Sequence, residues 1–151
     1  MENWLNNPTF VVYAITAVVL NINLLFVWGY SGAARAKTKT AVNKEDAERF
    51  RTAYAHADPP EVARVLRAHA NAQAMIYPFL FLGLVFVLAG GSAGFAEVVF
   101  GVFTAARILH SIVYLAGKQP WRTAFFTVSA AAIIALLGDI VWLVIQGPAG
   151  H

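Results

Sequence analysis

The segment AHANAQAMIYPFLFLGLVFVLAGG, residues 68–91, decides the fold of this chain. It contains 24 residues and no Asp, Glu, Lys or Arg, and a helix of about 20 apolar residues is long enough to cross the hydrocarbon core of a bilayer. Backbone N–H and C=O groups in lipid must be hydrogen-bonded within the protein, and a helix achieves this within one segment. The segment therefore predicts a transmembrane helix, which we expect to occupy about residues 62–91.

The composition of the whole chain supports the same interpretation. Of its 151 residues, 59% are hydrophobic and 13% are charged, whereas a soluble domain has about 45–50% and about 25%. A soluble fold of this length could not bury so much apolar surface, and the same hydrophobicity excludes a disordered chain. Three further apolar stretches, at about 8–30, 95–115 and 121–146, are long enough to span a membrane. We therefore predict an all-α integral membrane protein with one four-helix domain over residues 1–151.

Basic residues are concentrated in alternate connections between the predicted spans. The solvated loop at about 31–61 and the connection at 116–122 carry Lys and Arg, whereas the turn at 89–97 carries none. Since Lys and Arg are retained in cytoplasmic loops, we predict that both basic connections are cytoplasmic and both termini are not. Asp58 is expected to cap the second span. The alanine-rich helices and short N-terminus favour a bacterial inner membrane over the endoplasmic reticulum.

Polar and ionisable residues inside the predicted spans follow helical spacing. Such groups are costly in a membrane, so each one indicates a pairing or a function. Arg67 and Asn71 are four residues apart and share one helix face. Arg107, His110 and Tyr114 form one stripe of the third span.

The predicted topology brings the conspicuous polar residues to one level of the bundle. The residues expected in its cytoplasmic half are Arg35, Arg67, Asn71, Arg107, His110, Tyr114 and Arg122. The forked guanidinium group of arginine matches carboxylates and phosphates, so four arginines predict a pocket for a polyanionic small molecule. The alternative is that the arginines extend to phospholipid headgroups.

Asn21 and Asn23 of the first span have a simpler interpretation. They lie on different faces of the helix and cannot both point in one direction. We expect them to hydrogen-bond to neighbouring helices.

Several segments resemble the MAPEG family, the membrane-associated proteins of eicosanoid and glutathione metabolism. RVLRAHAN at 64–71 and IYPFLFLG at 76–83 are similar to the family's second helix. Shorter segments resemble its first loop, third helix and fourth helix: NKEDA at 43–47, RILHSIVYL at 107–115 and PWRT at 120–123. The resemblance extends over about residues 10–147.

The resemblance implies a homotrimer of four-helix protomers, with glutathione bound between adjacent protomers near the cytoplasm. Catalytic roles are implied for Arg122, for Thr123, which stands where a family member has a serine proposed to activate the thiol, and for Asp46 of the first loop. The implied glutathione-binding residues are Arg35, Arg67, Asn71, His110, Tyr114 and Arg122, with Arg107 supporting them.

Three positions depart from the family pattern. Ala74 stands where the family has an acid that should hold the glutathione ammonium group. Ala70 replaces an arginine, and Phe126 replaces a tyrosine of the fourth helix. These departures bear on both glutathione affinity and substrate choice.

Three classes of function follow from these features. The first is a glutathione transferase, peroxidase or glutathione-dependent isomerase, which takes lipophilic electrophiles or peroxides from the membrane. The second is a non-catalytic scaffold of the same fold that binds glutathione or lipid. The third is a small transporter or channel, although the outer halves of the spans are nearly free of charge. The chain has no cysteine, and we predict no metal site; the net charge of +3 is assigned to membrane topology rather than to nucleic acid.

Overall fold

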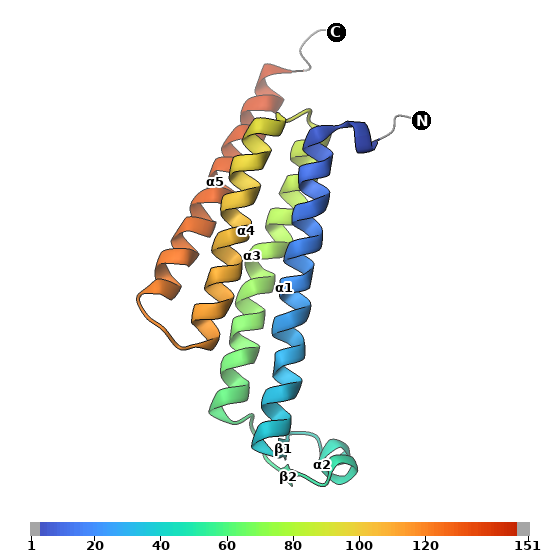
Figure 1. The fold of residues 1–151 in the computed structure, drawn as a ribbon, viewed down its shortest axis with the longest axis vertical. Helices are drawn as coiled ribbons and strands as arrows, with labels where there is room; N and C mark the ends of the chain where they lie inside the picture. The colour runs from blue at the N-terminus through green and yellow to red at the C-terminus, as the bar shows by residue number, and fades with distance from the viewer. Residues whose placement is uncertain (1–3, 148–151) are drawn as a thin grey trace.

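Four long helices run side by side along the molecule (Figure 1). The computed structural model describes residues 4–147, and the long helices are α1 (Pro8–Thr38), α3 (Pro60–Leu88), α4 (Ala93–Leu115) and α5 (Trp121–Gln146). A 3-10 turn, η1 (Trp4–Asn6), precedes α1. Each long helix is long and apolar enough to cross a membrane, which confirms the predicted all-α fold with four spans.

Local sequence explains where two of these helices begin. The Asn7 side-chain oxygen accepts hydrogen bonds from the backbone N–H groups of Thr9 and Phe10, at 3.0 and 3.2 Å, and caps α1. Ser92 caps α4 in the same way through its hydroxyl oxygen, which accepts from the N–H of Phe95 at 3.3 Å. Asn and Ser are favoured at this position because they satisfy amides that have no partner in the first helical turn.

α1 is longer than predicted. It continues to Thr38 instead of ending at about residue 30. The added residues, SGAARAKT at 31–38, include four residues with strong helix propensity at 33–36, and Arg35 and Lys37 lie in the last turn, where positive charge is favoured. Arg35 is therefore part of α1, whereas the predicted span ended before it.

The segment after α1 is also more structured than the predicted loop. It forms β1 (Thr40–Ala41), α2 (Lys44–Phe50) and β2 (Ala53–Tyr54). The two strands pair in parallel, with Thr40 opposite Ala53. The segment from β1 to β2 lies at one end of the molecule (Figure 1). We call this end of the molecule the loop end.

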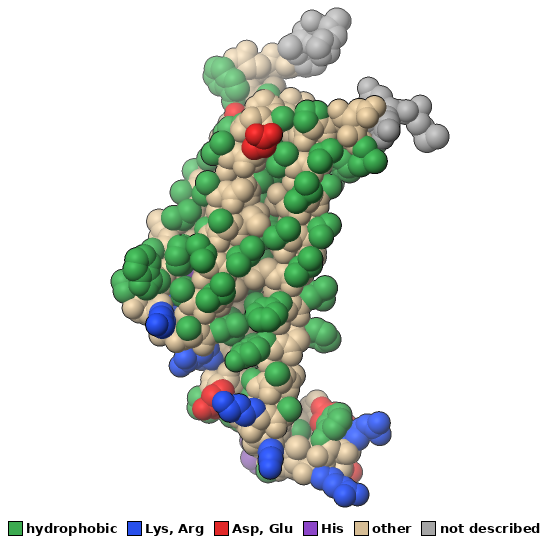
Figure 2. Space-filling model, viewed as in Figure 1, with side chains coloured by type: hydrophobic (Ala, Val, Ile, Leu, Met, Phe, Trp, Pro, Cys, Tyr) green, Lys and Arg blue, Asp and Glu red, His purple; other side chains and the backbone are tan. Residues whose placement is uncertain are grey.

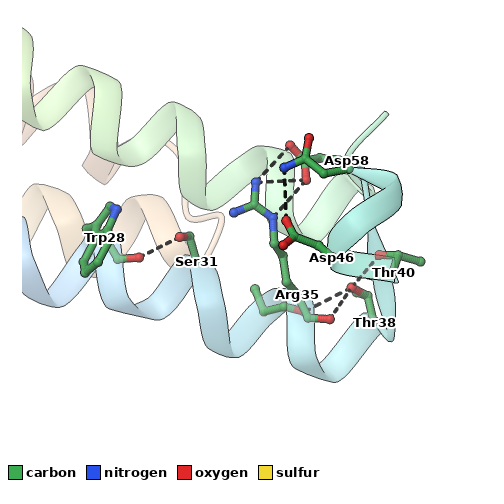
Figure 3. Close-up of polar contacts among 9 residues, drawn as sticks. Trp28, Ser31, Arg35, Thr38, Thr40, Asp46 and Asp58 are labelled. Atoms are coloured by element: carbon green, nitrogen blue, oxygen red, sulfur yellow. Dashed lines mark hydrogen bonds and ion pairs between the residues drawn. The ribbon is translucent and has the colours of Figure 1, made fainter. Parts of the chain in front are cut away.

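The prediction that Asp58 caps the second span is wrong. Pro59 occupies the cap position of α3 without a side-chain hydrogen bond. The Asp58 carboxylate instead accepts from Arg35, at 3.3 Å from Nε and 3.2 Å from Nη2 (Figure 3). This ion pair attaches the end of the loop to the last turns of α1.

The core is formed by aromatic rings on facing helices. Phe79 of α3 stacks on Phe103 of α4 with ring centroids 3.7 Å apart, and it meets Phe100 edge-on at 5.2 Å. Other large apolar side chains point outward: Phe81 is 72% exposed and Ile145 is 74% exposed. Figure 2 shows hydrophobic side chains along the length of the helices and Lys and Arg gathered toward the loop end, as expected of a bundle surrounded by lipid.

Candidate functional site

A small cleft lies where α3, α4 and α5 approach one another toward the loop end. Its volume is about 210 Å³. We call it the α3–α5 cleft, and it is lined by Asn71, His110, Tyr114, Arg122, Thr123 and Phe126. Five of these six residues were predicted as site residues, and the sixth, Phe126, was noted as a departure from the family pattern.

Aromatic contacts hold one side of the cleft. His110 and Tyr114 are one helical turn apart on α4, and their ring centroids are 5.5 Å apart. The Arg122 guanidinium carbon lies 4.8 Å from the centroid of the Tyr114 ring, which is within the range of a cation–π interaction. Phe126 closes the group, with its ring centroid 6.4 Å from that of His110. Two members of the stripe predicted on the third span, His110 and Tyr114, therefore form the aromatic side of the cleft, and Arg122 contacts Tyr114.

Gln119 does not line the cleft, but it contacts two residues that do, and the sequence interpretation missed it. With its amide oxygen toward the guanidinium, it accepts from Arg122 Nη2 at 2.7 Å and from Nε at 3.2 Å. Its amide nitrogen then donates to the Thr123 hydroxyl at 3.3 Å. The spacing of three and four residues from Gln119 to Arg122 and Thr123 was the available signal. Gln119 and Tyr114 together orient the arginine at the start of α5.

Arg107 is completely buried behind the cleft. Its Nη2 atom donates to the Asn71 side-chain oxygen at 2.9 Å and to the Asn71 backbone oxygen at 3.4 Å. Its Nε and Nη1 atoms are buried and have no hydrogen-bond partner among the described residues. Arg107 therefore lies inside the bundle rather than at phospholipid headgroups, and its contact fixes one cleft residue on α3 from α4.

Polar contacts continue from Arg107 to α1. The Ser111 hydroxyl donates to the Arg107 backbone oxygen at 3.0 Å, and Asn23 Nδ2 donates to the Ser111 hydroxyl oxygen at 3.1 Å. The interhelical hydrogen bond predicted for Asn23 is confirmed. Asn21 differs, because it is exposed and donates to the Ala17 oxygen of its own helix at 2.8 Å.

Arg35 and Asp46 lie at a different place, a second cavity of about 670 Å³ at the loop end. This cavity is bordered by the end of α1, by β1 and by α2, and Arg35 is paired there with Asp58 (Figure 3). α1 and α3 extend further toward the loop end than α4 and α5 (Figure 1). Arg35 consequently lies beyond the level of the α3–α5 cleft.

Arg67 also stays outside the cleft. Its side chain is exposed on α3, on the outward side that also carries Ala70 and Ala74, and it is not among the residues that line the α3–α5 cleft. The predicted convergence of four arginines is therefore wrong for a single protomer. The structure brings Arg107 and Arg122 to the same site and leaves Arg35 and Arg67 apart from it.

Comparison with known proteins relates this sequence to one family. Residues 13–142 match the sequence model of the MAPEG family. Prostaglandin E synthase of Equus caballus is 35% identical over 131 residues, which cover 86% of each chain, and that of Homo sapiens is 31% identical over 139 residues, which cover 91% of each. Microsomal glutathione S-transferase 1 of Sus scrofa is 34% identical over 129 residues, covering 81% of this chain and 83% of the relative.

Proposed function

This chain is a multi-pass membrane protein that belongs to the MAPEG family, and on that basis we propose that it is a glutathione-dependent enzyme acting on lipophilic electrophiles or peroxides. Its reaction would be that of a glutathione transferase or peroxidase, or of an isomerase related to prostaglandin E synthase. The observation that carries the proposal is the α3–α5 cleft, in which a partly buried arginine is held at the first turn of a membrane helix.

Glutathione supplies the chemistry that this cleft suits. It has two carboxylates, one ammonium group and a thiol, and its nucleophile is the thiolate. Arg122 lies in the first turn of α5, where the helix dipole adds positive charge. The guanidinium and the dipole together would stabilise the thiolate, and the Thr123 hydroxyl would donate a hydrogen bond to sulfur. Attack on a lipophilic electrophile then forms the new bond to sulfur, and the leaving group departs with its electron pair.

The remaining cleft residues would bind the rest of glutathione. Arg107 holds the Asn71 side-chain oxygen, which leaves the Asn71 amide nitrogen to donate to a carboxylate. His110 and Tyr114 would contribute ring nitrogen and hydroxyl groups to the same ligand.

A thiolate-difference absorbance measurement tests the proposal. Adding glutathione to the purified protein should give the absorbance of a bound thiolate at a pH where free glutathione is a thiol. The glutathione analogue with serine in place of cysteine is the control, because it should bind without the signal. The absence of both a thiolate signal and calorimetric binding of glutathione would contradict the proposal.

The α3–α5 cleft of one protomer is too small for this ligand alone. Its volume of about 210 Å³ is below the roughly 300–1,000 Å³ of ordinary ligand pockets. We propose that a neighbouring protomer completes the site and contributes Arg35, Arg67 and Asp46, which do not line their own cleft. Asp46 would then take its catalytic part from across the interface.

The proposed shared site predicts a homotrimer. Native mass spectrometry of the detergent-solubilised protein should show three chains of 16.4 kDa each. Arg35→Ala and Arg67→Ala should weaken glutathione binding without changing this mass. A stable monomer that binds glutathione with full affinity would contradict the shared site.

The orientation in the membrane is a further prediction. The chain has no cysteine, so a single introduced cysteine is labelled only at its own position. An impermeant maleimide added outside intact cells should label Asn6→Cys but not Lys39→Cys or Lys118→Cys. Labelling of position 39 from outside would reverse the proposed topology.

A non-catalytic scaffold is the second candidate function. The observation that favours it is the outward side of α3, where Ala70 and Ala74 offer no charged group and no acid for the glutathione ammonium. Glutathione that binds without a thiolate signal and without turnover of any electrophile would support the scaffold.

A further inference from the structure

A buried polar chain connects α1 to the α3–α5 cleft through residues that do not line it. Asn23 of α1 donates to Ser111 of α4, Ser111 donates to the backbone oxygen of Arg107, and Arg107 donates to Asn71 of α3. Only Asn71 lines the cleft. This polar chain therefore begins at Asn23 on α1 and ends at Asn71 in the cleft.

The first three side chains of this polar chain are buried, so each one relies on its neighbour in the series for a hydrogen bond. Asn23 is 8% exposed, Ser111 is 4% exposed and Arg107 is fully buried. The single hydroxyl proton of Ser111 is directed to the Arg107 oxygen, so the hydroxyl oxygen is the group that accepts from Asn23. In an apolar interior a polar group that loses its partner is strongly destabilised. The hydrogen bonds consequently define one arrangement of α1, α4 and the Arg107 backbone.

The Arg107 guanidinium is held at one nitrogen only. Nη2 contacts Asn71, whereas Nε and Nη1 have no partner among the described residues. Its position therefore depends on its own backbone in α4, where the Ser111 hydroxyl contacts the Arg107 oxygen and Asn23 joins Ser111 to α1. That position decides which atom of the Asn71 amide faces the cleft, because a guanidinium can bind only the amide oxygen.

We propose that Asn23 and Ser111 are positioning residues of the glutathione site. They fix the α4 backbone at Arg107, and through the Arg107–Asn71 hydrogen bond they keep the Asn71 amide nitrogen directed to the ligand. The inference rests on the proposed function for its ligand, but its structural part can be measured without glutathione.

The chain offers matched controls for both residues. Ser129 is also buried and donates to the backbone oxygen four residues earlier, Phe125, at 2.6 Å, but no hydrogen bond joins it to another helix among the described residues. Asn21 lies on the same helix as Asn23, and within residues 4–147 its side chain hydrogen-bonds only to that helix. Ser129→Ala and Asn21→Leu therefore remove the same side-chain groups outside the polar chain.

Calorimetry should separate these variants. Ser111→Ala and Asn23→Leu are expected to raise the Kd for glutathione by about three- to tenfold, the scale of one neutral hydrogen bond. Ser111→Thr should restore binding because it keeps the hydroxyl, and the two controls should bind as the unchanged protein does. The double variant should lose little more than either single variant, because the two residues act through one chain.

A ligand-free measurement makes the test independent of glutathione binding. In protein labelled with 15N-asparagine, the side-chain resonance of Asn71, identified by its loss in Asn71→Ala, should shift in Ser111→Ala and Asn23→Leu but not in the controls. A Ser111→Ala protein with lower thermal stability and an unchanged Asn71 resonance would overturn the proposal in favour of simple packing. If the unchanged protein binds no glutathione, the proposed function fails, and the Asn71 resonance alone decides the positioning role.

Discussion

Arg122→Ala is expected to lower kcat/KM for glutathione conjugation to a model electrophile such as chlorodinitrobenzene by roughly tenfold to a thousandfold. This is the scale of losing one donor that stabilises developing negative charge. Arg122 is held by the Tyr114 ring and by the Gln119 amide oxygen, so its charge is already oriented before the ligand arrives. The thiolate signal should fall together with turnover.

Neighbouring variants separate the charge of Arg122 from general damage to the loop end. Thr123→Val should cost less than Arg122→Ala, because the guanidinium remains, and Thr123→Ser should retain activity. Lys118→Ala removes an exposed positive charge four residues earlier and should leave kcat/KM unchanged. Turnover at the level of the unchanged protein in Arg122→Ala would show that the proposed site is wrong.

Arg107→Met is expected to weaken glutathione binding by roughly tenfold to a hundredfold, the scale of a hydrogen bond made by a charged group. The substitution removes the donor that holds the Asn71 side-chain oxygen at 2.9 Å. It also removes a buried charge that pairs with no acid among the described residues. The two Arg107 donors that have no partner there, Nε and Nη1, are removed with it. Replacing buried charged groups by apolar ones of similar volume is often neutral or stabilising.

The Arg107→Met protein should therefore unfold at the same temperature as the unchanged protein or at a higher one. Calorimetry gives the affinity, and a thermal melt in detergent gives the unfolding temperature. Arg64→Met is the control, because Arg64 is an exposed arginine of α3 outside the cleft, and it should change neither quantity. Retained affinity, or a large fall in the unfolding temperature, would contradict a functional role for this buried charge.

Helical spacing was enough to predict that His110 and Tyr114 share one face of α4. His110 and Tyr114 were placed on one stripe of the third span, and their rings lie one turn apart against Arg122 and Phe126. The interhelical hydrogen bond of Asn23 was also predicted, because a membrane leaves few arrangements for an amide side chain.

The sequence by itself determined four apolar helices and the face of α4 that carries His110 and Tyr114, because hydrophobic length and the 3.6-residue period are local properties. Only the tertiary structure decided that α1 and α3 extend beyond α4 and α5, which separates Arg35 from Arg122 (Figure 1). Only the tertiary structure paired Asp58 with Arg35 and directed Arg107 to Asn71. The physical reason is that such contacts depend on the axial offset and rotation of whole helices, which are set by packing between segments far apart in the chain.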